Sequence, residues 1–262
     1  MHGPAAPAII SLRQLAADLA AALLFSTRLP VPGAAAISGA DIARAGWALP
    51  VAGAIVGMIA AAVYWLARLA GLPPLPAAGL TIAASMLATG CLHEDGLADL
   101  ADSFGAATRE RKLEIMRDSR IGTYGVCALF TSLLLRAGAL ATISEPALAA
   151  PILVATHMAA RSSMAPFMRL LPPAREDGLS VGVGRPPGVS AVAAAIIGVL
   201  ALGLALGPAA GLFAVVLMAS EFALLAWLCM RQIGGQTGDV LGALEQIGEI
   251  TILLVAAATA GA

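Results

Sequence analysis

The chain has 262 residues, of which 60% are hydrophobic and 12% charged, and its mean hydropathy is +0.90. An ordinary globular domain carries roughly 25% charged residues, so the composition excludes a typical soluble protein and predicts an all-α, polytopic helix bundle in a lipid bilayer. The net charge of -1 does not bear on nucleic-acid binding, and no basic block suggests such a partner, so none is predicted. The three cysteines lie in apolar segments without metal-ligand spacing, so no disulfide framework is predicted.

The first predicted element is a short apolar run from Leu12 to Phe25, within an N-terminal segment that extends over residues 1–45. Asp18 lies inside this run, and Thr27–Pro32 follows it in place of a small-residue cleavage site. The pattern favours an interfacial or partly buried helix over a signal peptide.

Runs of about 18 or more apolar residues, the length that crosses a bilayer, follow through the rest of the chain. About seven spans are predicted, at residues 47–70, 75–92, 125–143, 147–166, 188–206, 209–229 and 239–261. They form a single membrane domain over residues 1–262, with long loops at 93–124, 167–187 and 230–238.

The basic residues predict the orientation of these spans. The short connections at 71–74, 144–146 and 207–208 contain no Lys or Arg, whereas the long loops and the N-terminal segment contain many. The positive-inside rule therefore places the N-terminus and the three long loops in the cytoplasm.

The densest group of charges directly follows the second predicted span, where His93, Glu94, Asp95, Asp99 and Asp102 occupy ten residues. In a helix, the three aspartates fall at positions i, i+4 and i+7 and point from one face within about 60°, while Glu94 points about 100° away. Carboxylates held this close repel one another unless a cation lies between them. We interpret the aspartate face as a Mg²⁺ site; the alternative is a solvated acidic helix start, but the helix dipole does not require three carboxylates on one face.

A second group of candidates precedes the third span. Arg117, Asp118 and Arg120 lead into Gly122 and Thr123. Guanidinium groups bind phosphate bidentately, and a glycine-rich helix start exposes backbone N–H groups to an anion. This pattern favours phosphate binding, although the arginines can also serve as positive-inside anchors of the span.

The start of the last span provides a third group. Residues Gly234–Asp239 resemble a phosphate-binding loop in composition, but they lack the spacing and the lysine of a P-loop, which leaves Thr237 and Asp239 as candidates. Within the span, Glu245 and Glu249 form an i, i+4 pair. Carboxylates rarely face lipid, so this pair either joins the site or is satisfied by arginines of neighbouring helices.

Four motifs now stand in a fixed order: residues 25–32, 93–99, 113–125 and 234–243. Together they resemble the cobalamin (5′-phosphate) synthase family, whose members are adenosylcobinamide-GDP ribazoletransferases. The resemblance extends from about residue 25 to residue 250, with one departure, since Asp102-Ser103 stands where the family usually has Asp-Gly.

The resemblance implies a Mg²⁺-dependent enzyme of the bacterial inner membrane with its active site facing the cytoplasm. It implies that adenosylcobinamide-GDP is joined to α-ribazole or α-ribazole 5′-phosphate, with release of GMP. The residues expected to bind metal are Asp95, Asp99, Asp102 and Asp239, and those expected to bind substrate are Arg28, Arg117, Asp118, Arg120, Thr123, Thr237 and Asp239. An oligomer is compatible with the sequence but is not predicted by it.

Two other functions use similar residues. A membrane phosphotransferase of the CDP-alcohol type also clusters aspartates, but its Asp-Gly followed by Ala-Arg is not met by Asp95–Asp99. A secondary transporter could use Asp18, Glu221, Glu245 and Glu249 for ion coupling. The predicted site lies at one membrane face rather than at the midplane, and no inverted repeat is apparent, which argues against transport.

Overall fold

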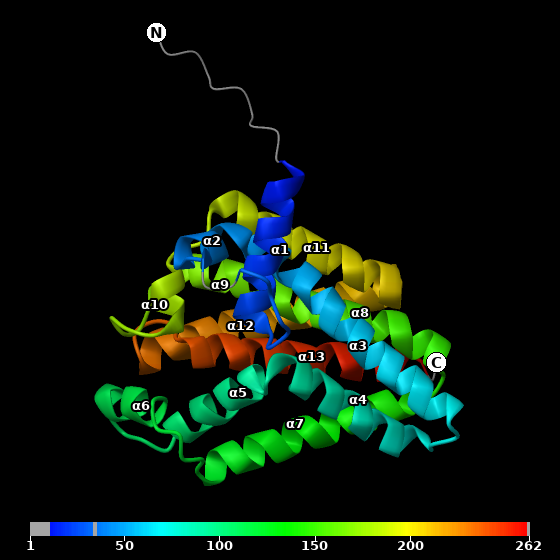
Figure 1. Ribbon diagram of the computed structural model, residues 1–262. Coiled ribbons are helices and arrows are strands. Elements are labelled where there is room, and N and C mark those ends of the chain that lie inside the picture. Colours follow the sequence, from blue (N-terminus) through cyan, green and yellow to red (C-terminus); the bar gives the residue numbers. More distant parts are fainter. Residues whose placement is uncertain (1–10, 34–35, 261–262) are drawn as a thin grey trace.

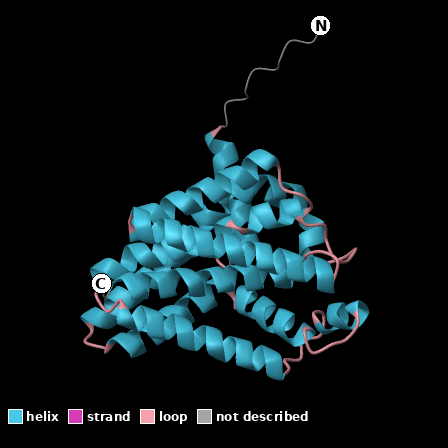
Figure 2. Ribbon diagram, turned by 180° about the vertical axis from the view of Figure 1, so that it is seen from behind, coloured by secondary structure: helices cyan, strands magenta, loops and turns pink. Residues whose placement is uncertain are grey.

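The structure is a computed structural model that describes residues 11–33 and 36–260 (Figure 1). Within these ranges the chain forms helices and loops and no strand, which confirms the predicted all-α class (Figure 2). The elements are α1 (Leu12–Ser26), α2 (Gly39–Arg44), the 3-10 helix η2 (Ala45–Ala48), α3 (Leu49–Leu69), α4 (Pro74–Thr89), α5 (Leu92–Ser103), α6 (Arg109–Ile115), α7 (Thr123–Thr142), α8 (Pro146–Ser162), α9 (Met164–Leu170), α10 (Leu179–Val183), α11 (Gly188–Leu206), α12 (Pro208–Gln232) and α13 (Gly238–Ala260).

Helix α13 runs through the middle of the bundle (Figure 1) and packs against α5, α7, α8 and α12. In its most apolar window, 78% of the residues are buried inside the protein, far more than in the other long helices. This burial explains why α13 can carry glutamates in a membrane protein: its side chains face other helices rather than lipid.

Among the described residues, five helices can cross a membrane by length and composition: Gly39–Leu69, Thr123–Thr142, Gly188–Leu206, Pro208–Gln232 and Gly238–Thr259. Helices α4 and α5 pass the same test only as a pair, which is bent by 91°, so the total is five or at most six. The predicted number of about seven is higher because the spans at 75–92 and 147–166 correspond to short helices, α4 with 16 residues and α8 with 17.

The bend between α4 and α5 has a local cause. Gly90 adopts the left-handed conformation with φ 66°, and Cys91 follows with φ 57°. Two successive left-handed residues end a right-handed helix and re-aim the chain. The loop predicted at 93–124 therefore begins with helix α5 and also contains α6.

Helix α1 matches the predicted N-terminal helix, and its one carboxylate, Asp18, is buried. The side chain of Asp18 is 5% exposed. It accepts hydrogen bonds from Trp47 Nε1 at 2.9 Å, Arg44 Nε at 3.1 Å and Gln14 Nε2 at 2.8 Å. These donors compensate the carboxylate and tie α1 to the start of the long α2–α3 segment.

Candidate active site

The acidic helix α5 lies against the first turns of α13. A Cβ added at Gly96 would lie 2.7 Å from the carbonyl oxygen of Asp239, and one added at Gly242 would lie 3.2 Å from the Cα of His93. The two helix backbones touch at these glycines because neither has a side chain. The contact brings Asp95 and Asp99 of α5 next to Asp239 of α13.

These aspartates form a dense group of like charges. Asp99 is influenced electrostatically by Asp95, Asp239 and Asp102, and by one cation, Arg175. Asp95 is exposed, and Asp99 and Asp239 are partly buried. Hard carboxylate oxygens at a solvent-accessible position are the donor set that Mg²⁺ prefers, so these side chains fit the expected ion.

Asp102 uses its carboxylate differently. It accepts the backbone N–H groups of Gly122 at 2.6 Å and Gly125 at 2.8 Å, which lie at the first turn of α7. A carboxylate at this position satisfies free N–H groups and complements the helix dipole. The structure therefore brings Asp102 into contact with the start of α7.

The ligand atoms of Asp95, Asp99 and Asp102 do not form a tight group in this structure. In the part of the chain that is described, the only set of three His, Cys, Asp or Glu side chains with ligand atoms within 4.8 Å of one another is His157, Glu245 and Glu249. The Mg²⁺ site on the aspartate face stays a prediction.

Asp239 is held in place by the loop before α13. Thr237 Oγ1 donates to Asp239 Oδ2 at 3.1 Å and accepts the N–H of Val240 at 3.3 Å, as an N-terminal cap does. The neighbouring Gln236 pairs with the loop after α9, since it accepts from the N–H of Ala174 at 2.8 Å. This pairing brings the α9–α10 loop to the site.

The predicted phosphate-binding arginines form ion pairs at the surface. Arg120 binds Asp118 through Nε and Nη2 at 3.0 and 2.5 Å, and Arg117 Nη2 lies 2.5 Å from Asp177 Oδ1. These hydrogen bonds to guanidinium hold the pKa of Asp118 and of Asp177 below the usual value for aspartate. The side chains of Arg117 and Arg120 are 50% and 84% exposed, so both can exchange their partners for a substrate phosphate at low cost.

A cavity of about 470 Å³ opens beside the start of α7. Asp102, Asp118, Arg120 and Thr123 line it, so the structure gathers four of the predicted site residues around one space. Arg28 lies elsewhere, at the α4–α5 break: its N–H donates to the carbonyl of Ala88 at 2.8 Å.

A second polar cluster lies deeper in the bundle and joins α5, α7, α8 and α13. Arg136 of α7 reaches Glu249 at 3.0 Å and Glu94 at 3.2 Å, and all three side chains are at most 6% exposed. Glu94 thus faces the bundle while its neighbour Asp95 faces solvent, as the 100° step of a helix predicts.

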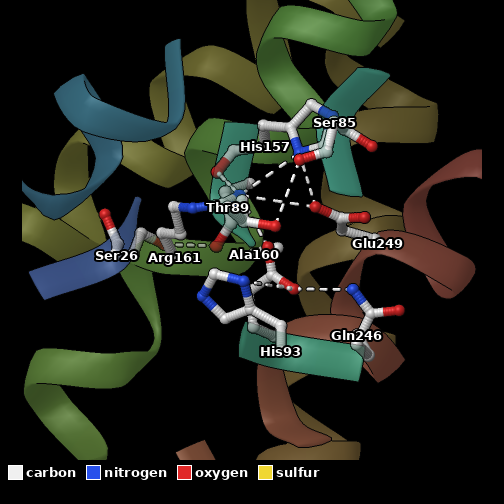
Figure 3. A network of polar contacts seen from close by, with 12 residues as sticks. Ser26, Ser85, Thr89, His93, His157, Ala160, Arg161, Gln246 and Glu249 are labelled. Carbon is white, nitrogen blue, oxygen red and sulfur yellow. Dashed lines mark hydrogen bonds and ion pairs between the residues drawn. The ribbon is translucent and has the colours of Figure 1, made fainter. Parts of the chain in front are cut away.

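Helix α8 supplies the other half of this cluster. Arg161 Nη1 lies 2.6 Å from Glu245 and 3.3 Å from Glu249, and His157 Nδ1 lies 2.5 Å from Glu249. Figure 3 shows His157 and Arg161 directed toward Glu249, with His93 and Gln246 nearby. Of the two alternatives for the α13 glutamates, the structure shows the second: arginines of neighbouring helices satisfy them.

Comparison with known proteins identifies relatives along nearly the whole chain. A family model described as cobalamin-5-phosphate synthase matches residues 18–257. The chain is 55% identical over 253 residues to an adenosylcobinamide-GDP ribazoletransferase of Bradyrhizobium diazoefficiens, covering 96% of this chain and 97% of that protein. Proteins with the same description in Mesorhizobium japonicum and Azorhizobium caulinodans are 50% and 46% identical, with at least 92% of this chain and 95% of each relative covered. No solved structure matches the chain.

Proposed function

This chain belongs to the cobalamin-5-phosphate synthase family, and we propose that it joins adenosylcobinamide-GDP to α-ribazole or α-ribazole 5′-phosphate with release of GMP. The observation that carries the proposal is the match to a ribazoletransferase that covers 96% of this chain and 97% of the relative. The arrangement of aspartates and arginines around the start of α5, α7 and α13 supports it, since phosphoryl transfer depends on positioning and charge neutralisation.

In the proposed reaction, a hydroxyl oxygen of the ribazole attacks the phosphorus that carries the cobinamide. A new P–O bond forms, the anhydride bond breaks, and GMP leaves with the bonding electron pair. Asp95, Asp99 and Asp239 would hold Mg²⁺, which supplies neutralisation of the phosphate charge when bound. A carboxylate of the same group accepts the proton of the attacking hydroxyl.

The arginines of the site would orient the diphosphate. Arg117 and Arg120 can release Asp177 and Asp118 to bind phosphate oxygens, because both pairs are exposed. Thr123 and the N–H groups at the start of α7 extend this surface beside the cavity. The reactive groups would then lie between α5 and the α6–α7 loop.

We place the site at the cytoplasmic face of a bacterial inner membrane. The α5–α7 and α9–α11 connections, which contain basic residues, and the end of α12, which carries Arg231, lie at the end of the bundle that holds α5 and α6 (Figure 1), whereas the α3–α4, α7–α8 and α11–α12 connections contain no Lys or Arg. This distribution supports the orientation through the positive-inside rule. The water-soluble substrates would enter from the cytoplasm.

Purified protein in liposomes, supplied with adenosylcobinamide-GDP, α-ribazole phosphate and Mg²⁺, is expected to release GMP. Asp99→Asn should abolish turnover and Mg²⁺ dependence, whereas Glu114→Gln, which changes an exposed carboxylate of α6, should not. A folded wild-type preparation that releases no GMP would refute the function. Near-normal turnover by Asp99→Asn would instead show that the acidic face is not the metal site.

A further inference from the structure

Arg175, in the loop between α9 and α10, differs from the other arginines around the site. Its side chain is only 12% exposed, yet it makes no hydrogen bond within the described residues, and its Nε and Nη1 atoms are fully buried without a partner. Its nearest carboxylate oxygens are Asp239 Oδ2, 3.5 Å from Nη2, and Asp177 Oδ1, 3.9 Å from Nε. A buried guanidinium with unused donors is costly and requires an explanation.

The backbone around Arg175 holds the guanidinium at this place. Gly178 has φ +100°, a conformation that L side chains rarely adopt, and a Cβ there would lie 3.1 Å from Arg175 Nε and 3.3 Å from Nη2. The N–H of Ala174 donates to the carbonyl of Gln236, and the N–H of Gln236 donates to the carbonyl of Pro172, which fixes the residue before Arg175 next to the start of α13. The guanidinium is therefore positioned by the fold rather than by a bonded partner.

The charges nearby indicate what the free donors are for. Arg175 is the cation that acts on both Asp99 and Asp239, the carboxylates expected to hold Mg²⁺. A phosphate bound to an ion at these aspartates would present its remaining oxygens to the neighbouring guanidinium. Arginine suits this role because its planar donors match phosphate oxygens in pairs.

We infer that Arg175 binds the diphosphate of the cobinamide substrate, and that the phosphate oxygens accept the hydrogen bonds for which the described residues offer no acceptor. The inference rests on the proposed function and adds a substrate-binding residue to it. Arg117 and Arg120 differ in that each already donates a hydrogen bond to a carboxylate, so they recruit the substrate at the rim while Arg175 binds it inside.

The test uses Arg175→Met, which keeps most of the side-chain stem and removes the donors, with Arg109→Met for comparison. Arg109 donates to the carbonyls of Ile233 at 2.8 Å and Ala174 at 2.6 Å, so its loss should lower the unfolding midpoint without ligand. Arg175 donates no such bond, so the unfolding midpoint of Arg175→Met should lie closer to that of the wild type than the midpoint of Arg109→Met does. Arg111→Ala, at an exposed residue, serves as the unaffected control.

Binding of adenosylcobinamide-GDP, measured by titration calorimetry on each detergent-solubilised full chain, should weaken about 100-fold in Arg175→Met, since truncating a buried charged donor has effects of this order. Binding of unphosphorylated α-ribazole should not change. In the GMP-release assay, KM for adenosylcobinamide-GDP should rise while KM for α-ribazole stays constant. Arg175→Lys should recover part of the affinity, because it restores the charge without the paired donors.

The two proposals fail in different ways. If the wild type does not bind adenosylcobinamide-GDP, the proposed function is wrong, and inorganic pyrophosphate with Mg²⁺ becomes the probe for Arg175. If the wild type binds either probe and Arg175→Met binds it equally well, the inference about Arg175 is wrong. Equal weakening of α-ribazole binding would likewise contradict it, because that result indicates general disruption of the site.

Discussion

Removing Arg136 should destabilise the bundle by about 3–5 kcal/mol, the range found when one partner of a buried ion pair is lost. Arg136 is 2% exposed and lies between Glu94 at 3.2 Å and Glu249 at 3.0 Å. In Arg136→Met, Glu249 keeps His157 and Arg161, but Glu94 has no other cationic partner among the described residues. The cost therefore arises mainly at Glu94.

This reasoning predicts strong coupling between positions 136 and 94. Glu94→Gln alone should cost about 1–2 kcal/mol, because one charge-assisted hydrogen bond is weakened while Arg136 keeps Glu249. Combining Glu94→Gln with Arg136→Met removes the isolated carboxylate, so the double variant should recover about 2 kcal/mol relative to the sum of the single losses.

The free energy of unfolding can be measured in mixed micelles at increasing SDS fraction, with the fluorescence of Trp47, Trp65 and Trp227 as the signal. Arg111→Met is the matched control: its exposed pair with Glu114 should contribute less than about 1 kcal/mol. If the double variant loses the sum of the two single losses in free energy of unfolding, to within about 0.5 kcal/mol, the reasoning is refuted. Such additivity shows that the two side chains do not depend on each other.

Two further predictions concern α5. Gly96→Ala places a methyl group 2.7 Å from the carbonyl oxygen of Asp239, so it should separate α5 from α13 and lower both the unfolding midpoint and GMP release. Gly79→Ala, at an open helical position, should lower neither. Equal behaviour of the two variants would contradict the close contact between α5 and α13. Asp102→Ala removes the carboxylate that accepts two N–H groups at the start of α7 and should cost about 1–2 kcal/mol of stability even without Mg²⁺. Metal-free stability equal to the wild type would show that Asp102 does not cap α7.

The helices could be predicted from sequence because hydropathy acts locally: a long apolar run in a bilayer satisfies its backbone only as a helix. The bend at Gly90 and Cys91 escaped this reasoning. The apolar run continues through these residues, and a cysteine in the left-handed conformation has no recognisable sequence signal. The single predicted span at 75–92 therefore ends early, and the acidic segment begins a new helix.

The candidate site was predictable to the extent that helix periodicity determines it. The 100° step between Glu94 and Asp95 correctly separates their directions, and the i, i+4 spacing of Glu245 and Glu249 places both on one face. Periodicity could not show that Asp102 is engaged by α7, because that contact depends on how the chain returns after α6. The position of Arg175 beside Asp239 could not be predicted for the same reason: it depends on pairing between residues 172–174 and Gln236.

Helix α5 connects the deep charge cluster with the acidic face, because Glu94 belongs to the cluster and the next residue, Asp95, belongs to the face. Any rotation of α5 that changes the direction of Asp95 also moves Glu94 away from Arg136. In a buried, membrane-embedded setting the loss of that pair is expensive, so the rotation of α5 is fixed from inside the bundle. The aspartates that face the site are thus oriented by charges that do not touch it. A mutation in the cluster should alter activity through the direction of Asp95 and Asp99, even where the bundle stays folded.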